Sequence, residues 1–369
     1  MKRIIATTLI PLLFLAAALS SCTQQAKINE KKISIVCTIF PQYDWARQIL
    51  GDKIEYADLT LLLKNRIDLH SYQPSVDDIV AISSCDLFIY VGGESDGWVI
   101  DVLKQSVNRD MLVINLLDIL GESVKVEEII EGMEKEDDKK DKEGDVEADD
   151  IKDKEGDVEE DDKKDKEADL EAEDKKDKEA DLERDVEEDD IGCDEHVWLS
   201  LKNAKLLCPA IAGAISSLDS VNADEYRNNL DAYLEKLTAL DSEYQKALDS
   251  TRLKTLLFGD RFPFRYLVDD YGLDYYAAFV GCSAETEASF ETIIFLANKT
   301  DALGLANIMV TESSDKKIAE TIIRESKDSD RQILVLNSIQ SVVPSDIENG
   351  ATYLSIMESN LSVLIEALE

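Results

Sequence analysis

Short apolar runs alternate with helical patterns along most of the chain. Runs of β-branched and other apolar residues, typical of buried strands, occupy residues 33–39, 56–63, 86–93 and 111–117. Between the first three runs, Pro41 and Pro74 open two stretches with helical character, "PQYDWARQILGD" and "PSVDDIVAISSC". This alternation of strand and helix predicts right-handed βαβ units and a mostly parallel sheet.

A long amphipathic stretch lies in the middle of the chain. After Asn222, a candidate helix cap, tyrosines and leucines recur at steps of three and four as far as Leu248. This spacing places them on one face of a helix about 27 residues long, which would measure roughly 40 Å. A helix of that length is long for a single globular lobe, so we expect it to connect two lobes.

A second α/β set completes the chain. Strands are predicted at residues 254–260, 273–280, 305–312 and 332–338, with helices between them and a closing helix at the end. The predicted fold class is therefore α/β. Two lobes with mostly parallel sheets, residues 33–218 and 251–369, are joined by one long helix over residues 219–250. Ligands of open α/β sheets bind at the carboxyl ends of the strands, so we expect a binding cleft between the lobes.

An acidic repeat interrupts the first lobe at about residues 134–190. It holds 32 acidic and 13 basic residues, a net charge of −19 in a chain whose net charge is −39. With no aromatic and few aliphatic side chains it cannot bury enough surface to offset its ordering entropy, so a disordered insertion is predicted. The large negative net charge disfavours nucleic acid and anionic lipid as partners and suits a protein that interacts with cations.

The first residues indicate where the protein is located. Lys2 and Arg3 precede an apolar run over residues 4–19 that ends in "LSSC". The run is too short and too early for a stable membrane span and predicts a signal peptide over residues 1–22. The cysteine that follows it favours lipid attachment at Cys22, on the extracytoplasmic face of the cell membrane. A plain secreted protein is the alternative.

Five further cysteines follow the leader. Cys37, Cys85 and Cys208 lie in apolar contexts and are expected to be small buried side chains. Cys193 and Cys282 lie in predicted loops. The odd number leaves at least one cysteine unpaired within the chain.

The only two histidines, His70 and His196, stand in predicted loops beside acidic residues. His70 follows a predicted strand, and Asp194 and Glu195 adjoin His196. Neutral imidazole is a common ligand for zinc and manganese, and a carboxylate beside it can fix its tautomer. A structural or solvated role is the alternative for each histidine. We do not expect an enzyme, because the chain has no H-E-x-x-H, no G-x-S-x-G and no glycine-rich phosphate loop.

The motifs "DLHSYQPSVDDI", "DEHVWLSLKNA" and "LSSC" resemble the substrate-binding lipoproteins of bacterial zinc and manganese ABC importers. The order of features matches as well: signal, first histidine after a strand, charged insertion, second histidine, long helix and second lobe. The resemblance covers most of residues 33–367 outside the repeat. It implies two lobes bridged by one rigid helix, with the metal in the cleft between them.

The resemblance also implies where the metal ligands lie. Four side chains usually bind metal in that family, and His70 and His196 match the two histidines of the first lobe. The third position, His or Glu in the family, is occupied by Arg261, which cannot ligate a cation. The fourth, Asp in the family, is occupied by Asn337, which offers one amide oxygen.

Several nearby residues are candidate substitutes in the second lobe. Asp260 adjoins Arg261, while Glu285 and Glu287 lie in a loop where the family has an acid that holds a histidine. Cys193 or Cys282 could supply a thiolate, which would favour zinc over manganese. Arg261 itself could pair with one of the acids or hold an anion.

The function that the resemblance implies is an extracytoplasmic receptor, expected to be a monomer. It would deliver Zn²⁺, or Mn²⁺, to an ABC permease in the cell membrane. The alternative is a surface lipoprotein with a role in adhesion or envelope interactions that has lost tight metal binding, as the changes at Arg261 and Asn337 suggest. The acidic repeat could collect divalent cations loosely, or serve only as a solvated tether.

Overall fold

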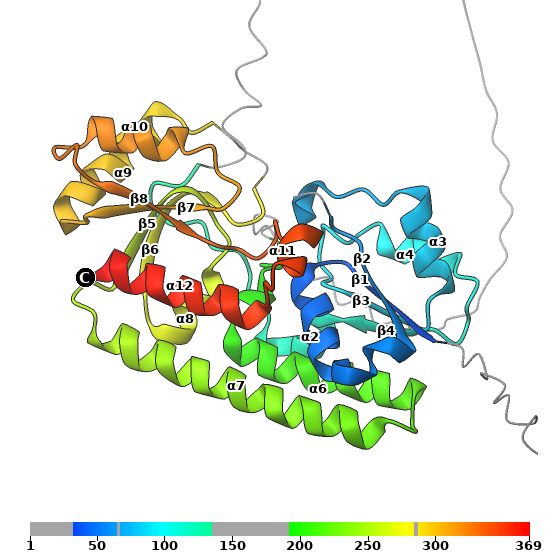
Figure 1. Ribbon diagram of the computed structural model, residues 1–369. Coiled ribbons are helices and arrows are strands. Elements are labelled where there is room, and N and C mark those ends of the chain that lie inside the picture. Colours follow the sequence, from blue (N-terminus) through cyan, green and yellow to red (C-terminus); the bar gives the residue numbers. More distant parts are fainter. Residues whose placement is uncertain (1–31, 65–66, 135–191, 284–286) are drawn as a thin grey trace, which may run out of the picture.

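Two lobes lie side by side above one long helix (Figure 1). The computed structural model describes residues 32–64, 67–134, 192–283 and 287–369. Cys22, Glu285 and the acidic repeat from residue 135 onward therefore lie outside the described residues. Across the four described ranges, no helix has the length and apolar character needed to cross a bilayer.

The first lobe is built on a four-stranded parallel sheet in the order β2-β1-β3-β4. Its strands are β1 (Ile33–Cys37), β2 (Ala57–Leu61), β3 (Leu87–Tyr90) and β4 (Leu112–Asn115). Central strand β1 pairs with β2 on one side and with β3 on the other, so Ile35, Val36 and Cys37 are fully enclosed. This burial on both faces accounts for the uninterrupted apolar run in the sequence.

Helices and short 3₁₀ turns connect these strands. The helices are α2 (Phe40–Leu50), α3 (Val76–Ser84), α4 (Val99–Lys104), α5 (Leu116–Leu120) and α6 (Leu201–Leu218), and the 3₁₀ turns are Gly51–Tyr56, Leu69–Ser71, Gly121–Ser123 and Val197–Leu199. Helix α3 begins at a capping box: Ser75 Oγ accepts the N–H of Asp78 at 3.2 Å, and Asp78 Oδ2 accepts the N–H of Ser75 at 3.0 Å. The cap ends the loop that carries His70.

The second lobe repeats the architecture with a parallel sheet in the order β6-β5-β7-β8. Its strands are β5 (Thr255–Phe262), β6 (Asp274–Val280), β7 (Asn307–Thr311) and β8 (Gln332–Leu336). Its helices are α8 (Arg265–Tyr271), α9 (Phe290–Leu303), α10 (Lys317–Glu325), α11 (Pro344–Glu348) and α12 (Tyr353–Leu368). Each of the eight strands predicted from the apolar runs is present, and the predicted α/β fold class is confirmed.

Helix α7 (Ala223–Ser250) runs beneath both lobes (Figure 1). It packs against α2 and α6 of the first lobe and against α8 and α12 of the second. Its buried side chains are those of the predicted stripe: Tyr226, Leu230, Tyr233, Leu237, Leu240, Tyr244 and Leu248. The period of the stripe therefore identified both the helix and its buried face.

Helix α12 is a second connection between the lobes, which the sequence did not predict. The Tyr353 N–H donates to Asp44 Oδ2 of α2 at 2.8 Å, and the Tyr353 hydroxyl donates to the Trp198 carbonyl at 2.7 Å. The indole N–H of Trp198 in turn donates to the Ser338 carbonyl at 2.9 Å. These buried contacts tie the first lobe to the loop after β8.

Residues 127–134, which the sequence assigned to the first lobe, lie against the second. The Glu134 N–H donates to the Ala278 carbonyl of β6 at 3.0 Å. Further back along the chain, Val126 and Cys193 form an antiparallel bridge, and the Glu127 N–H donates to the Gly192 carbonyl at 3.0 Å. Residues 192 and 193 therefore lie next to residues 126 and 127, where the chain passes from the first lobe to the second.

Candidate metal centre

His70 is carried by the short 3₁₀ turn after β2, at the junction of the lobes. The Asp68 carboxylate caps this turn by accepting the N–H of His70 at 3.0 Å. Leu69 is fully buried, and its N–H donates to Gln340 Oε1 of the second lobe at 3.4 Å. The turn is thus fixed by a polar cap and an apolar anchor, which leave the His70 side chain 8% exposed.

His196 is fully buried at the start of the 3₁₀ turn Val197–Leu199. Asp194 Oδ1 lies 2.8 Å from the backbone nitrogen of His196 and 2.9 Å from its Nδ1. A carboxylate only accepts hydrogen bonds, so Nδ1 carries the ring proton and Nε2 presents a lone pair. This is the carboxylate–histidine arrangement that orients metal-binding imidazoles.

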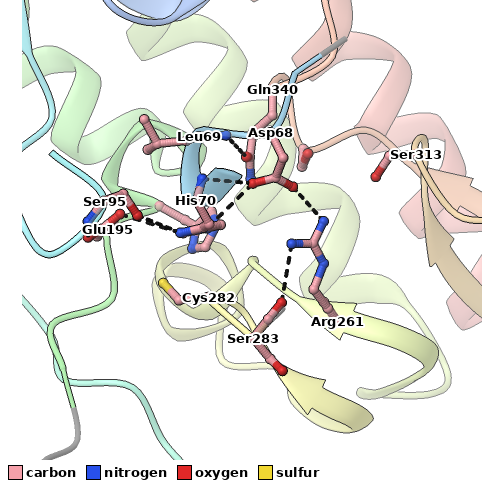
Figure 2. Close-up of polar contacts among 12 residues, drawn as sticks. Asp68, Leu69, His70, Ser95, Glu195, Arg261, Cys282, Ser283, Ser313 and Gln340 are labelled. Atoms are coloured by element: carbon pink, nitrogen blue, oxygen red, sulfur yellow. Dashed lines mark hydrogen bonds and ion pairs between the residues drawn. The ribbon is translucent and has the colours of Figure 1, made fainter. Parts of the chain in front are cut away.

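The two imidazoles meet through their Nε2 atoms, which are 3.2 Å apart. Since His196 Nε2 accepts, His70 Nε2 donates in this arrangement, and His70 Nδ1 accepts from Ser95 Oγ at 2.7 Å (Figure 2). Two nitrogens bound to one tetrahedral zinc at about 2.05 Å would lie about 3.3 Å apart. The observed spacing therefore matches a pair of ligands to a single small cation.

A second acidic side chain, Glu195, lies close to the His70 imidazole. Glu195 Oε2 lies 3.6 Å from His70 Nδ1, and Glu195 Oε1 accepts the N–H of Ser95 at 2.8 Å. Burial, and then the neighbouring His196, hold the pKa of His70 well below its usual range. His70 is therefore neutral near pH 7, the form in which imidazole binds metal.

Cys282 is the third metal-binding side chain at this point. It follows β6 in the second lobe, and its Sγ and one nitrogen of each histidine all lie within 4.8 Å of one another. Burial, followed by the nearby Glu127 carboxyl, raises the pKa of the Cys282 thiol, while the backbone N–H of Glu195 acts in the opposite direction. The sequence alone indicates Cys282 only as one of two candidate thiolates, beside Cys193.

Arg261 crosses the junction to pair with a first-lobe acid. Its guanidinium donates to Asp68 Oδ2 at 2.5 Å and to the Ser283 carbonyl at 3.4 Å (Figure 2). Burial tends to raise the pKa of Asp68, but the positive charge of Arg261 and hydrogen bonds lower it overall. The charge of Arg261 is thus compensated beside the histidines.

The other predicted second-lobe ligands are engaged elsewhere. Asn337 Oδ1 accepts the N–H of Ile339 at 2.7 Å, and Asp260 Oδ2 accepts the N–H and hydroxyl of Thr311 at 2.9 and 2.6 Å. Glu287 is exposed, near Lys317. Within the described part of the chain, neither Asp260 nor Glu287 joins the histidine–cysteine group, and Asn337 Oδ1 is taken up by its own loop.

Three residues that support the group gave no signal in the sequence. Ser95 contacts His70, and Glu127 Oε1 accepts the N–H of Cys282 at 2.7 Å. A Cβ atom at Gly281 would lie 3.0 Å from His196 Cε1, so glycine lets the turn approach the ring. Their partners are far away in the sequence, and a serine, a glutamate and a glycine are common loop residues.

A polar cavity of about 340 Å³ adjoins the group on the second-lobe side. Asp68 and Ser71 of the first lobe line it, together with Asp260, Arg261 and Ser283 of the second. It therefore spans the junction between the lobes, where the sequence placed the cleft.

Comparisons with known proteins place this geometry in context. A sequence model of the family described as "ZnuA: Zinc-uptake complex component A periplasmic" matches residues 35–367. The zinc-binding lipoprotein AdcA of Streptococcus pneumoniae serotype 4 is 28% identical over 349 residues, which are 95% of this chain and 58% of AdcA. The zinc-binding protein AdcA of Streptococcus pyogenes serotype M6 is 23% identical over 346 residues, 92% of this chain and 57% of that protein.

The chain thus spans little more than half the length of these two relatives. The high-affinity zinc uptake system protein ZnuA of Bacillus subtilis is closer in size: it is 25% identical over 357 residues, which cover 97% of this chain and 94% of that protein.

Solved structures share the fold at low sequence identity. The Zn(II)-bound ZnuA-like domain of Streptococcus pneumoniae AdcA has a TM-score of 0.61 at 23% identity and covers 91% of this chain and 99% of its own. The laminin-binding protein Lmb of Streptococcus agalactiae, described as having adhesin and metal-transporting activity, has a TM-score of 0.63 at 19% identity, with coverage of 91% and 100%. These similarities support the two-lobe fold.

Proposed function

Because the chain belongs to the family of zinc-uptake complex component A, we propose that it is an extracytoplasmic receptor that binds Zn²⁺ and delivers it to an ABC import permease. The observation that carries this proposal is the 3.2 Å approach of the two Nε2 atoms of His70 and His196. Both rings are buried, and acidic residues stand behind their other nitrogens. In this proposal both Nε2 atoms bind the same ion, and the ring proton of His70 moves to Nδ1, which lies beside Ser95 Oγ and Glu195 Oε2.

The electrostatics of the centre favour a divalent cation. His70 is neutral, and Asp194 and Glu195 lie behind the rings. The Arg261 charge, which would oppose a cation, is offset by Asp68. Imidazole is a borderline ligand, so Zn²⁺ should bind more tightly than Ca²⁺ or Mg²⁺, and Mn²⁺ remains the second candidate.

The geometry weakens the adhesion alternative. That interpretation rested on the loss of ligands at Arg261 and Asn337. Two adjacent histidines with their supporting acids are nevertheless present, and the charge of Arg261 is paired with Asp68. An adhesion function without metal would give no reason to hold two imidazoles against each other in a buried site.

Zinc binding can be tested on the purified full chain by competition with a chelating indicator. The indicator removes the contribution of weak binding to the acidic repeat. The parent should bind one Zn²⁺ with an affinity tighter than micromolar, or about 8 kcal/mol. His70→Ala and His196→Ala should each lose at least tenfold in affinity, about 1.4 kcal/mol. Ser84→Ala, at an exposed position at the end of α3, is the control and should bind like the parent.

Two outcomes would contradict the receptor proposal. One is a parent that binds neither Zn²⁺ nor Mn²⁺ below about micromolar concentration. The other is a pair of histidine variants that bind as the parent does. Either result would favour the surface-interaction alternative.

Delivery and location need an experiment in cells. We propose a lipid anchor at Cys22, based on the "LSSC" motif, so Cys22→Ala should move the protein from the membrane fraction to the soluble extracytoplasmic fraction. In cells that depend on this chain for zinc uptake at low supply, the parent should restore uptake and His196→Ala should not. Unchanged membrane fractionation of Cys22→Ala would contradict the anchor alone.

A further inference from the structure

We propose that the Cys282 thiolate is a third ligand to the zinc ion, so that the centre is a His₂Cys site shared by both lobes. This proposal rests on the proposed function, in which His70 and His196 bind the ion. It goes beyond that function by naming the second-lobe ligand. It also accounts for the absence of a metal-binding side chain at Arg261.

The geometry brings the sulfur close to both imidazoles. Cys282 Sγ and one nitrogen of each histidine are mutually within 4.8 Å. Figure 2 shows the Cys282 side chain beneath His70, on the loop that follows β6. Ligands of a tetrahedral zinc with one sulfur at about 2.3 Å and nitrogens at about 2.05 Å lie about 3.3–3.6 Å apart. The proposal requires the side chains to close from within 4.8 Å to those separations when the ion binds.

The backbone that carries Cys282 is closely packed and hydrogen-bonded. Gly281 lies against the His196 ring, where a Cβ would meet Cε1 at 3.0 Å and the Phe262 carbonyl oxygen at 2.9 Å. The N–H of Cys282 donates to Glu127 Oε1 at 2.7 Å. The close approach at Gly281 and the hydrogen bond of the Cys282 N–H constrain the backbone at these two residues. The position of the thiol is therefore set by the fold and not by chance exposure.

Arg261 has a supporting role in this arrangement. Its guanidinium bonds the carbonyl of Ser283, the residue after Cys282, and at the same time the Asp68 carboxylate. It thereby ties the cysteine loop of the second lobe to the capped turn that carries His70. Arg261, which cannot ligate zinc, thus connects the two loops that carry the proposed ligands His70 and Cys282.

A thiolate ligand has consequences for metal choice. Two imidazoles and one thiolate form a set that suits Zn²⁺ and disfavours Ca²⁺, Mg²⁺ and Mn²⁺, which prefer oxygen. Binding displaces the thiol proton to solvent, since the thiolate is the form that ligates. Three protein ligands leave one tetrahedral position for water or an exchangeable group, as in zinc sites that must exchange a ligand.

Cobalt(II) is the probe that tests the sulfur directly. It occupies tetrahedral zinc sites, and a Co²⁺–thiolate bond gives a charge-transfer absorption in the near ultraviolet that oxygen and nitrogen ligands do not. The carboxylates of the acidic repeat contain no sulfur and cannot contribute to this band. The reduced full chain can therefore be titrated with Co²⁺. We expect the band to saturate at one equivalent and to disappear when Zn²⁺ displaces Co²⁺.

Matched cysteine variants complete the test. Cys282→Ser should lose the band and at least tenfold in zinc affinity, while Cys193→Ser, an exposed cysteine outside the group, should keep both. If the parent binds one Co²⁺ without the band, or Cys282→Ser binds zinc as the parent does, the inference is wrong and the two-histidine receptor still stands. If the parent binds no metal at all, both proposals fail. Because the band is read on the parent, an unstable variant does not decide the result.

Discussion

Asp96 is a buried carboxyl group whose ionisation opposes folding. Its Oδ2 accepts the N–H groups of Val91 at 2.9 Å and Gly92 at 3.0 Å, whereas its Oδ1 has no hydrogen-bond partner. Burial, with a further contribution from Glu195, raises the pKa of Asp96 to about 7 despite those N–H groups. We predict that Asp96→Asn makes the folded protein more stable at pH 8.

The size of the effect follows from proton linkage. In the unfolded chain the pKa of an aspartate is about 3.9. Between that pH and about 7, the folded state binds more protons at Asp96 than the unfolded state does, so the free energy of unfolding falls as the pH rises. The complete shift of about three units corresponds to roughly 4 kcal/mol, of which about 2 kcal/mol is lost between pH 5.5 and pH 8.

Urea unfolding of the parent and Asp96→Asn at the two pH values measures this quantity. A chelator keeps metal out, and the difference between the two proteins cancels the titration of the acidic repeat and of other groups. The variant should gain about 2 kcal/mol on the parent when the pH rises from 5.5 to 8. Asp101→Asn, at an exposed position on α4, should show no such gain. A difference that is equal at both pH values, or a less stable variant at pH 8, would refute the reasoning.

Three further predictions concern the metal centre. Asp194→Ala removes the carboxylate that orients His196, so zinc affinity measured by competition should fall about 10–100-fold; an unchanged affinity would remove Asp194 from the centre. Gly281→Ala places a Cβ against His196 and the Phe262 carbonyl, so the free energy of unfolding should fall by about 1–3 kcal/mol in chemical denaturation, whereas a neutral effect would mean that the turn yields freely. Asn337→Ala should lower the melting temperature, because Asn337 supports the positive φ of Ile339, but should leave zinc affinity unchanged; a weaker affinity would restore Asn337 as a ligand.

Local patterns were sufficient to predict the framework of the fold. The strands follow from apolar runs that are buried on both faces, as in β1, and α7 follows from a stripe with helical period. Each of these signals is local, because it is contained in the sequence of the element itself. The bridge made by α12 does not, because Tyr353 and its partner Asp44 are 309 residues apart and no local pattern indicates their contact.

The same limit applies to the candidate site. Scarcity and acidic neighbours singled out His70 and His196, and the resemblance paired them. The partners of Arg261 and Cys282 depend on how two distant loops pack: Arg261 meets Asp68, 193 residues away, and Cys282 meets Glu127, 155 residues away. A sequence identifies the side chains able to do the chemistry, but the packing of the two lobes decides which of them meet.

The bridge between Val126 and Cys193 has a consequence for how this gene can change. The Asp194 N–H also donates to the Lys125 carbonyl at 2.9 Å, so hydrogen bonds clamp the chain on both sides of the segment that contains the acidic repeat. In general, doubling the length of a closed loop adds only about 0.6 kcal/mol of closure cost. Gain or loss of a repeat unit by slipped replication would therefore leave His196 in register with His70. We therefore expect a change in the number of acidic units to leave the geometry of the histidine pair unchanged.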